Sequence, residues 1–205
     1  MKFFVGNLLF IAASLIFLAG STPGQVKNER LRLELLDMVK RDQAARDECA
    51  KGNADEQIKC IVRTAQEIDA PNTKRIEEIL NTTGFPTSKA VGIDGVKAYF
   101  LILQHSDSIV LRLRCRKGIG QAWREKVLSP SEYTGFIDRL LVKQGKPQIY
   151  GSNFESKDGK LIMSKTKDPK NLDKRRKHAG LPTIAEYVEM LKKAYNLEVV
   201  LTVVK

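Results

Sequence analysis

The sequence has 205 residues, of which 42% are hydrophobic and 29% are charged, and its formal net charge is +11 at pH 7. This composition is typical of a globular protein and excludes a disordered or collagen-like chain. The length allows one substantial hydrophobic core and is too short for two domains of average size.

The first 21 residues are predicted to form a secretory signal peptide. Lys2 supplies a short positive region, an apolar stretch follows from Phe3 to Ala19, and Ala19-Gly20-Ser21 has the small side chains of a cleavage site. The alternative is an uncleaved anchor, because about 18 apolar residues just suffice to span a bilayer. Turn-forming residues follow Ser21, so we expect cleavage there. The mature chain, residues 22–205, is then periplasmic or extracellular, and no later segment is apolar enough to cross a membrane.

Three cysteines remain in the mature chain, and export permits disulfides. Cys49 and Cys60 flank a polar turn between two expected helices. A bridge between them would close a short loop, add roughly 2–3 kcal/mol to the free energy of unfolding and leave Cys115 free. The alternative is that all three are reduced and act as small apolar side chains. No cysteine or histidine spacing suggests zinc, and no metal ligands are predicted. With only two histidines, His105 and His178, a histidine-rich metal site is excluded, whereas a site of one histidine and carboxylates is not.

Apolar residues at three- and four-residue steps predict four helices in the first part of the mature chain. The expected ranges are residues 31–49, 55–66, 69–83 and 95–105. Asp69 and Pro71 are expected to begin the third helix, which ends before Gly84, and Asp94 is expected to cap the fourth. The middle of the fourth helix is apolar on every side, which indicates that it is buried.

The next segment, residues 109–117, is ambiguous, because apolar residues alternate with arginines in the two-residue period of a strand. Capping boxes that begin at Ser129 and Thr183 predict two further helices. A short basic helix is expected over residues 171–179.

A small amount of β structure is also predicted. Lys157-Asp158-Gly159 is a hairpin turn signal, and β-branched residues favour a strand at the C-terminus. The expected strands are residues 148–154, 161–164 and 198–204.

The first candidate for function is the pair Asp42 and Arg46. Four residues apart, they share one face of the first helix and continue its apolar stripe. A charged pair in such a place needs partners or a wet cavity, so it predicts a ligand-binding arginine oriented by an aspartate. The alternative, and the commoner case, is an internal salt bridge or the exposed end of the helix.

The second candidate is Gln104-His105-Ser106-Asp107, which follows the buried helix directly. Polar groups at the end of a buried helix lie where a cavity can open, and a histidine near a carboxylate can act as an acid or base. The alternative is that His105 caps the last carbonyls of its helix, where its charge also suits the helix dipole.

The third candidate is the first strand of the expected hairpin. On a strand, Gln148, Tyr150 and Ser152 point to one face and could orient a ligand. The alternative is that they form the polar outer face of the hairpin.

Basic residues gather in the second half of the chain. Residues 155–177 contain nine basic and four acidic side chains, among them the run Lys174-Arg175-Arg176-Lys177. Such a surface can bind an anionic lipid or polysaccharide, while the commoner meaning of surface lysines is solubility. Nucleic acid is the less favoured partner, because the chain is expected to be exported and no aromatic residue interrupts the basic run.

A set of polar and glycine motifs spans residues 31–187. The motifs are Asp42-Gln43 with Arg46, Asp69 with Asn72, Gly84-Phe85-Pro86-Thr87, Val91-Gly92, Gln104-His105-Ser106-Asp107, Asp138-Arg139, Gly145-Lys146-Pro147-Gln148, Tyr150-Gly151, Asp173 with Arg175 or Arg176, and Gly180-Leu181.

This set resembles a bacterial family classed as a domain of unknown function, number 6624. Phe85 stands where that family usually has tryptophan, and Ser152-Asn153 where it usually has threonine and glutamine. The resemblance implies a fold and a motif set without a known chemistry. It also implies that residues 109–117 are helical, against their alternation. Asp138 and Arg139 point away from the apolar stripe of their helix and face solvent unless another element packs over them.

We therefore predict a single domain, residues 22–205, that is mainly α with a minor β part: six to eight helices, a small hairpin and a C-terminal strand. The leading functional hypothesis is a polar cleft that binds or acts on a small ligand, with His105 as acid or base and Arg46 as the partner of an anion or oxyanion. The remaining cleft residues are Asp42, Gln104, Gln148 and Tyr150. Two alternatives are a non-catalytic envelope module whose basic half binds anionic polymer or lipid, and a protein-interaction module or inhibitor. No cofactor is indicated.

Overall fold

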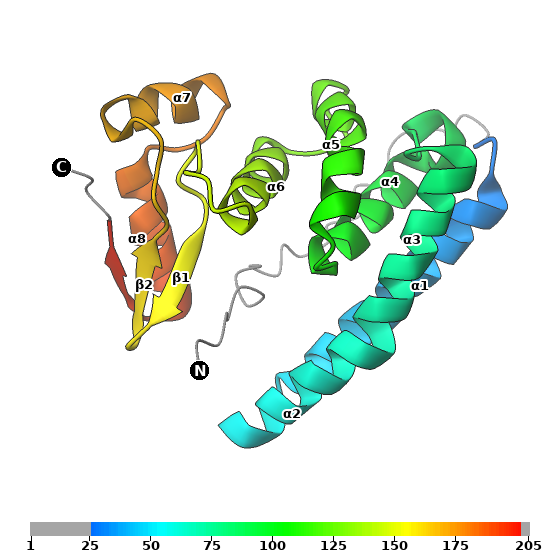
Figure 1. The fold of residues 1–205 in the computed structure, drawn as a ribbon, viewed down its shortest axis with the longest axis horizontal. Coiled ribbons are helices and arrows are strands. Elements are labelled where there is room, and N and C mark those ends of the chain that lie inside the picture. Colours follow the sequence, from blue (N-terminus) through cyan, green and yellow to red (C-terminus); the bar gives the residue numbers. More distant parts are fainter. Residues whose placement is uncertain (1–25, 202–205) are drawn as a thin grey trace. The chain divides into compact units, whose positions relative to one another are not determined.

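The computed structural model describes residues 26–201, which fall into two compact units that join at Leu128 and Ser129. These residues contain eight α-helices and one three-stranded sheet (Figure 1). The predicted mainly α fold with a minor β part is confirmed. The predicted signal peptide lies outside the described residues. Within residues 26–201 no helix is both long and apolar enough to cross a membrane.

The first unit is entirely helical. Its elements are α1 (Glu29–Cys49), α2 (Ala54–Thr64), a π-helical turn (Ala65–Asp69), α3 (Ala70–Thr83), α4 (Ser88–His105) and α5 (Ile109–Arg124). The chain from α2 to α3 returns antiparallel along α1, since Glu34 pairs with Arg75 near one end and Cys49 bonds to Cys60 near the other (Figure 1). α4 packs against both α1 and α3.

The core of this unit lies where α1, α3, α4 and α5 meet. Its fully enclosed side chains include Leu35, Ile76, Leu103 and Leu111, and the hydroxyl of Tyr99 donates a hydrogen bond of 2.9 Å to the carbonyl of Ile76. The α4 segment is therefore buried, as its all-round apolar sequence predicts.

The predicted break between the second and third helices is wrong. The chain stays helical from Ala54 to Thr83, and Asp69 has helical dihedrals and makes no cap hydrogen bond. Pro71 lacks an N–H group, and its ring would clash with a carbonyl four residues earlier in a regular helix. The wider π-turn immediately before it accommodates the proline. Such turns recur at functional sites, and this one frees the carboxylate of Asp69 for contacts outside its own helix.

α4 begins at Ser88, seven residues earlier than expected, but Gly92 interrupts it with a φ of 74°. Asp94 marks the start of the regular part, where its carboxylate accepts a hydrogen bond from the amide of Gly95 and pairs with Arg32.

Residues 109–117 are helical, so the alternation is misleading and the implication of the family resemblance is confirmed. Leu111, Cys115 and Ile119 recur at four-residue steps and are wholly buried, whereas Leu113 is 45% exposed. Arg112 is buried for a separate reason, since its guanidinium binds the carbonyls that end α4.

The second unit combines helices with a small sheet. Its elements are α6 (Pro130–Lys143), β1 (Phe154–Lys157), β2 (Lys160–Met163), a 3₁₀ turn (Pro169–Asn171), α7 (Leu172–His178), α8 (Ile184–Tyr195) and β3 (Glu198–Val200). β2 lies between β1, with which it pairs antiparallel, and β3, with which it pairs parallel. Both predicted capping boxes are present. β3 confirms the start of the predicted C-terminal strand, and residues 202–204 lie outside the described part.

Candidate functional site

A disulfide lies beside the main polar cluster of the first unit. Cys49 and Cys60 are bonded, with their Cα atoms 5.2 Å apart, as the sequence predicts, and Cys115 is a buried free thiol. The bond ties the end of α1 to α2, one helical turn beyond Arg46. It therefore holds together the two chain segments that supply Asp42 and Asp69.

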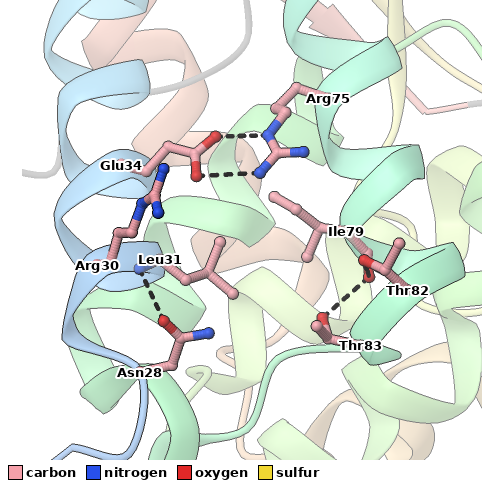
Figure 2. Close-up of a pocket in the computed structure, with 8 residues that line it drawn as sticks. All are labelled: Asn28, Arg30, Leu31, Glu34, Arg75, Ile79, Thr82 and Thr83. Atoms are coloured by element: carbon pink, nitrogen blue, oxygen red, sulfur yellow. Dashed lines mark hydrogen bonds and ion pairs between the residues drawn. The ribbon is translucent and has the colours of Figure 1, made fainter.

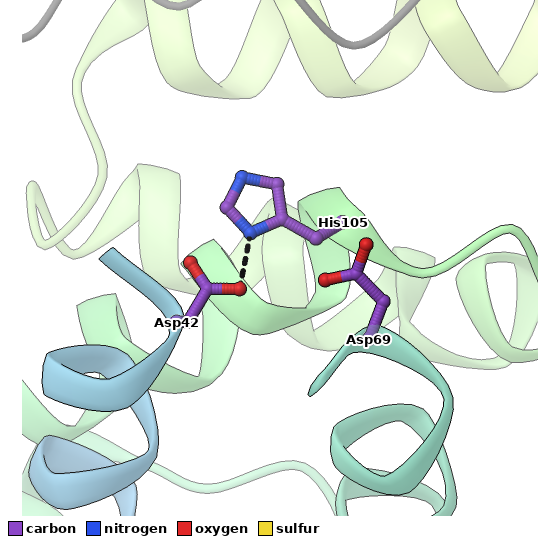
Figure 3. A group of neighbouring side chains, drawn as sticks. All are labelled: Asp42, Asp69 and His105. Carbon is purple, nitrogen blue, oxygen red and sulfur yellow. Dashed lines mark hydrogen bonds and ion pairs between the residues drawn. The ribbon is translucent and has the colours of Figure 1, made fainter. Parts of the chain in front are cut away.

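Four charged or titratable side chains meet in this cluster. Asp42 and Arg46 come from α1, Asp69 from the π-turn and His105 from the end of α4. Asp42 is wholly buried, while the side chains of His105, Asp69 and Arg46 are 8%, 11% and 25% exposed. Figure 3 shows the two carboxylates on either side of the imidazole. The structure thus unites Asp42, Arg46 and His105 of the predicted site and adds Asp69.

His105 is oriented by Asp42. Its Nδ1 lies 2.9 Å from Oδ1 of Asp42 and 3.2 Å from Nε of Arg46. A single ring nitrogen cannot both donate to the carboxylate and accept from the guanidinium, and the shorter, charge-assisted bond decides the assignment. Nδ1 therefore carries a proton and donates it to Asp42, and whenever the ring is neutral its lone pair lies on Nε2.

Arg46 is held between the two carboxylates. Its Nη2 lies 3.1 Å from Oδ1 of Asp42 and 2.5 Å from Oδ1 of Asp69, and its Nε lies 3.3 Å from Oδ2 of Asp42. Gln43 donates a further hydrogen bond of 2.7 Å to Oδ2 of Asp42. Both oxygens of Asp42 are therefore occupied, and its position is set by three neighbouring side chains.

The two carboxylates differ in their acidity. Burial opposes the ionisation of Asp42, but its hydrogen bonds and attraction to His105 and Arg46 outweigh burial and place its pKa below the ordinary value. Burial dominates at Asp69, where it raises the pKa despite the opposing attraction of Arg46. Asp42 is thus the more acidic carboxylate of the cluster, and Asp69 is the one that more readily takes up a proton.

Three polar positions in the cluster stay open. Within residues 26–201 no hydrogen bond is made by Nε2 of His105, Nη1 of Arg46 or Oδ2 of Asp69. Figure 3 shows Nε2 on the side of the ring that faces away from both carboxylates. The cluster therefore offers a ligand one basic nitrogen, one charged donor and one carboxylate acceptor.

Gln104, another predicted site residue, is buried at the end of α4 and accepts a hydrogen bond from Arg112 at 3.4 Å. Arg112 also binds the backbone carbonyls of Gln104 and Ser106 at 2.7–3.0 Å. This clamp fixes the end of α4, and with it the backbone that carries His105. Arg112 is thus a positioning residue that the sequence pattern did not single out.

The remaining predicted site residues, Gln148 and Tyr150, belong to the second unit. β1 begins at Phe154, so the residues before it form a loop in place of the expected strand. Gln148 is wholly buried. Its amide nitrogen donates to the carbonyls of Asn153 and Ser164, and its oxygen accepts from the amide of Asn153. These bonds use the hydrogen-bonding capacity of its side chain to hold the base of the hairpin.

Asp138 of α6 fixes the loop that contains Tyr150. Its carboxylate accepts hydrogen bonds of 2.7–3.1 Å from the backbone amides of Ile149, Tyr150 and Ser152 and from the Ser152 hydroxyl. The loop covers the face of α6 that periodicity alone assigns to solvent, and Asp138 is consequently wholly buried.

Two arginines of the basic run in α7 bind backbone carbonyls of the same loop. Arg176 donates to the carbonyls of Tyr150 and Pro182 at 2.7 Å and lies over the ring of Tyr187, and burial lowers its pKa. Arg175 donates to the carbonyl of Ile149 at 2.9 Å. Of the four bases, Lys174 and Lys177 are the exposed ones.

A separate pocket of about 170 Å³ lies between the start of α1 and the end of α3 (Figure 2). Its polar groups bind one another: Glu34 pairs with Arg75, the Asn28 side chain caps α1, and the hydroxyl of Thr83 donates to a helix carbonyl. The pocket is small and lies apart from the Asp42–His105 cluster, whose residues do not line it.

Residues 29–200 match the model of a family of unknown function, DUF6624. This match confirms the resemblance that the motifs indicated, and it runs through both compact units. Searches of curated proteins and of solved structures each gave no match.

Proposed function

The chain belongs to DUF6624, and we propose that in this member Asp42, Arg46, Asp69 and His105 bind a small ligand and transfer a proton to or from it. The observation that carries the proposal is the 2.9 Å bond between Nδ1 of His105 and the buried carboxylate of Asp42, which leaves Nε2 open. A histidine held in this way is the usual arrangement of a general base.

His105 and Asp42 have complementary parts in this proposal. Nε2 takes the proton from the ligand, and the Asp42 carboxylate balances the positive charge that the ring then acquires. Asp42 also fixes the ring orientation and the tautomer with Nε2 unprotonated. General acid–base catalysis by one positioned side chain contributes about 10²–10⁴-fold to a rate.

Arg46 supplies the charged donor. Asp42 and Asp69 hold its Nη2, so the guanidinium plane is fixed before a ligand arrives. Nη1 can then donate to a ligand oxygen on which negative charge develops as His105 removes the proton. A donor that is positioned in advance stabilises such charge without reorganising during the reaction.

Export is part of the proposal, supported by the predicted signal peptide and by the Cys49–Cys60 bond, which suits an oxidising compartment. The alternative of an anionic-polymer module has weaker support. Arg175 and Arg176 use their guanidinium groups on backbone carbonyls of their own unit, so half of the basic run is occupied internally.

The test is a screen of small carboxylates, phosphate esters, amides and sugars against the mature chain, with thermal stabilisation as the first readout and chemical conversion as the second. We expect a hit that is lost in Arg46→Met and whose conversion falls at least about 100-fold in His105→Gln. The control is His178→Gln, because His178 is an exposed histidine whose Nδ1 contacts the carbonyl of Lys174 in its own helix.

Equal conversion by the wild type and His105→Gln would refute the proton-transfer role. Hits that keep their full affinity in Arg46→Met would refute the ligand contact assigned to the guanidinium.

A further inference from the structure

The same cluster places three metal-ligating groups together. Asp42, Asp69 and His105 each offer one ligand atom, and these atoms lie within 4.8 Å of one another. In the tetrahedral geometry usual for zinc, two ligand atoms at bond lengths of about 2.1 Å stand about 3.4 Å apart. The cluster is therefore up to about 1.4 Å wider than a closed site, a difference that a rotation of the partly exposed Asp69 side chain can remove.

A cation already lies among these ligands, because the guanidinium of Arg46 contacts both carboxylates and His105. Two carboxylates face this one positive charge. The Arg46 side chain can move out of the cluster into solvent, since a quarter of it is exposed, whereas Asp42 is wholly enclosed. Withdrawal of Arg46 would leave two anions and an imidazole around an empty space, which only another cation would neutralise.

Asn72 gives an independent indication of a missing partner. It follows Asp69 by three residues and so shares its face of the helix. It is more than nine-tenths buried, and its Nδ2 has no hydrogen-bond partner within residues 26–201. Helical side chains lean toward the N-terminal turn, so the Asn72 side chain lies over the turn that carries Asp69, although its Nδ2 does not bond to that carboxylate. A buried donor of this kind calls for an acceptor, and the oxygen of a metal-bound water would supply one.

We propose that Asp42, Asp69 and His105 form a binding site for a divalent transition-metal ion, which enters when Arg46 withdraws and whose bound water accepts a hydrogen bond from Asn72. Two carboxylates and one imidazole suit a first-row ion such as Zn²⁺. The nitrogen that faces the carboxylates is Nδ1 (Figure 3), so the ion replaces the proton shared with Asp42. Metal binding and the proton transfer proposed above therefore exclude each other, and this inference does not rest on that function.

The test uses the mature chain, freed of metal by a chelator, and two probes. Zn²⁺ is titrated calorimetrically, and Co²⁺ is followed by visible absorption, which reports the coordination. We expect one ion per chain. Asp69→Asn should weaken binding at least about tenfold, because it removes one anionic ligand. The control is Asp37→Asn, since Asp37 is an exposed carboxylate on the same helix as Asp42.

Arg46→Met is the decisive variant. It removes the competing cation while it keeps an unbranched, helix-favouring side chain, so it should bind Zn²⁺ on the order of tenfold more tightly than the wild type. A purely structural salt-bridge cluster predicts no gain. If Arg46→Met does not fold, Asp69→Asn decides, because it leaves the Asp42–His105 bond in place.

Three results would overturn the inference: no stoichiometric ion in either the wild type or Arg46→Met, binding in Arg46→Met that is no tighter than in the wild type, or equal losses in Asp69→Asn and Asp37→Asn. Both titrations contain the metal alone. A chain that binds the ion, yet converts no ligand when it is free of metal, would therefore refute the proposed function and leave the metal site standing, and the opposite pair of results would do the reverse.

Discussion

Asp138 offers the sharpest test of how the second unit is held together. Its carboxylate accepts from four donors, three of them backbone amides within residues 149–152. Asp138→Ala leaves all four without their acceptor. A hydrogen bond to a charged group contributes about 1.5–3 kcal/mol, and water can reach some of these half-buried donors. If two of the four bonds stay unreplaced, the free energy of unfolding falls by about 3–6 kcal/mol.

The assay is urea unfolding followed by circular dichroism, with two graded comparisons. Ser152→Ala removes the hydroxyl bond alone and should cost about 1 kcal/mol. Asp138→Asn should lower the free energy of unfolding nearly as much as Asp138→Ala. The amide nitrogen of asparagine cannot accept a hydrogen bond, so the donors on its side would lose their acceptor. The control is Glu189→Ala, on the exposed surface of α8, which should stay within about 0.5 kcal/mol of the wild type. A loss below about 1 kcal/mol in Asp138→Ala would show that the loop is held by something other than Asp138.

Four further predictions concern the first unit. Cys49→Ser/Cys60→Ser, or reduction of the wild type, should lower the free energy of unfolding by about 3 kcal/mol in urea melts. Asp42 has a lowered pKa, so its contribution to stability is complete above the ordinary aspartate pKa and is lost as the pH falls through the folded value. Melting temperatures between pH 2 and 7 should therefore show an acid-dependent loss in the wild type that is smaller in Asp42→Asn. Asp69 has a raised pKa, so its ionisation lowers the free energy of unfolding, which is the opposite of the effect at Asp42. Asp69→Asn should therefore melt no lower than the wild type at pH 7. Asn72→Leu removes an unpartnered buried amide and should raise the free energy of unfolding by about 1 kcal/mol, as thermal or urea unfolding can measure, while it weakens the binding of Zn²⁺.

Local signals in the sequence predicted most helices well. The capping boxes at Ser129 and Thr183 begin helices as expected, and Gly84 ends one with a positive φ. Each signal acts through hydrogen bonds or backbone dihedrals within a few residues of itself. The disulfide was predicted for the same reason, because a short polar turn between two helices brings Cys49 and Cys60 together.

Contacts between distant segments explain the errors. The alternation in residues 109–117 predicts a strand, but Arg112 is buried because it binds the end of α4, which periodicity does not show. Asp69 was interpreted as a helix start because it precedes a proline, although the π-turn turns its carboxylate toward Arg46, 23 residues earlier. With Asp69 assigned to a cap, the sequence showed no set of metal ligands. Only the pairing of Asp69 with Asn72 in the family motifs hinted at another role.

The two polar clusters differ in how completely their members satisfy one another, and that difference identifies the candidate site. Gln148 and Asp138 spend their side-chain hydrogen bonds on backbone groups of the loop and hairpin. A network of this kind fixes a local structure and has little left to offer a ligand. The cluster around Asp42 is also held by several hydrogen bonds, yet His105, Arg46 and Asp69 each keep one polar atom that no other residue in 26–201 satisfies. None of these three atoms is among the enclosed, unpartnered side-chain polar atoms of residues 26–201, so each can be reached from solvent. The cluster around Asp42 therefore presents accessible, pre-positioned polar atoms to a ligand, whereas the loop network of Asp138 and Gln148 is spent on its own backbone.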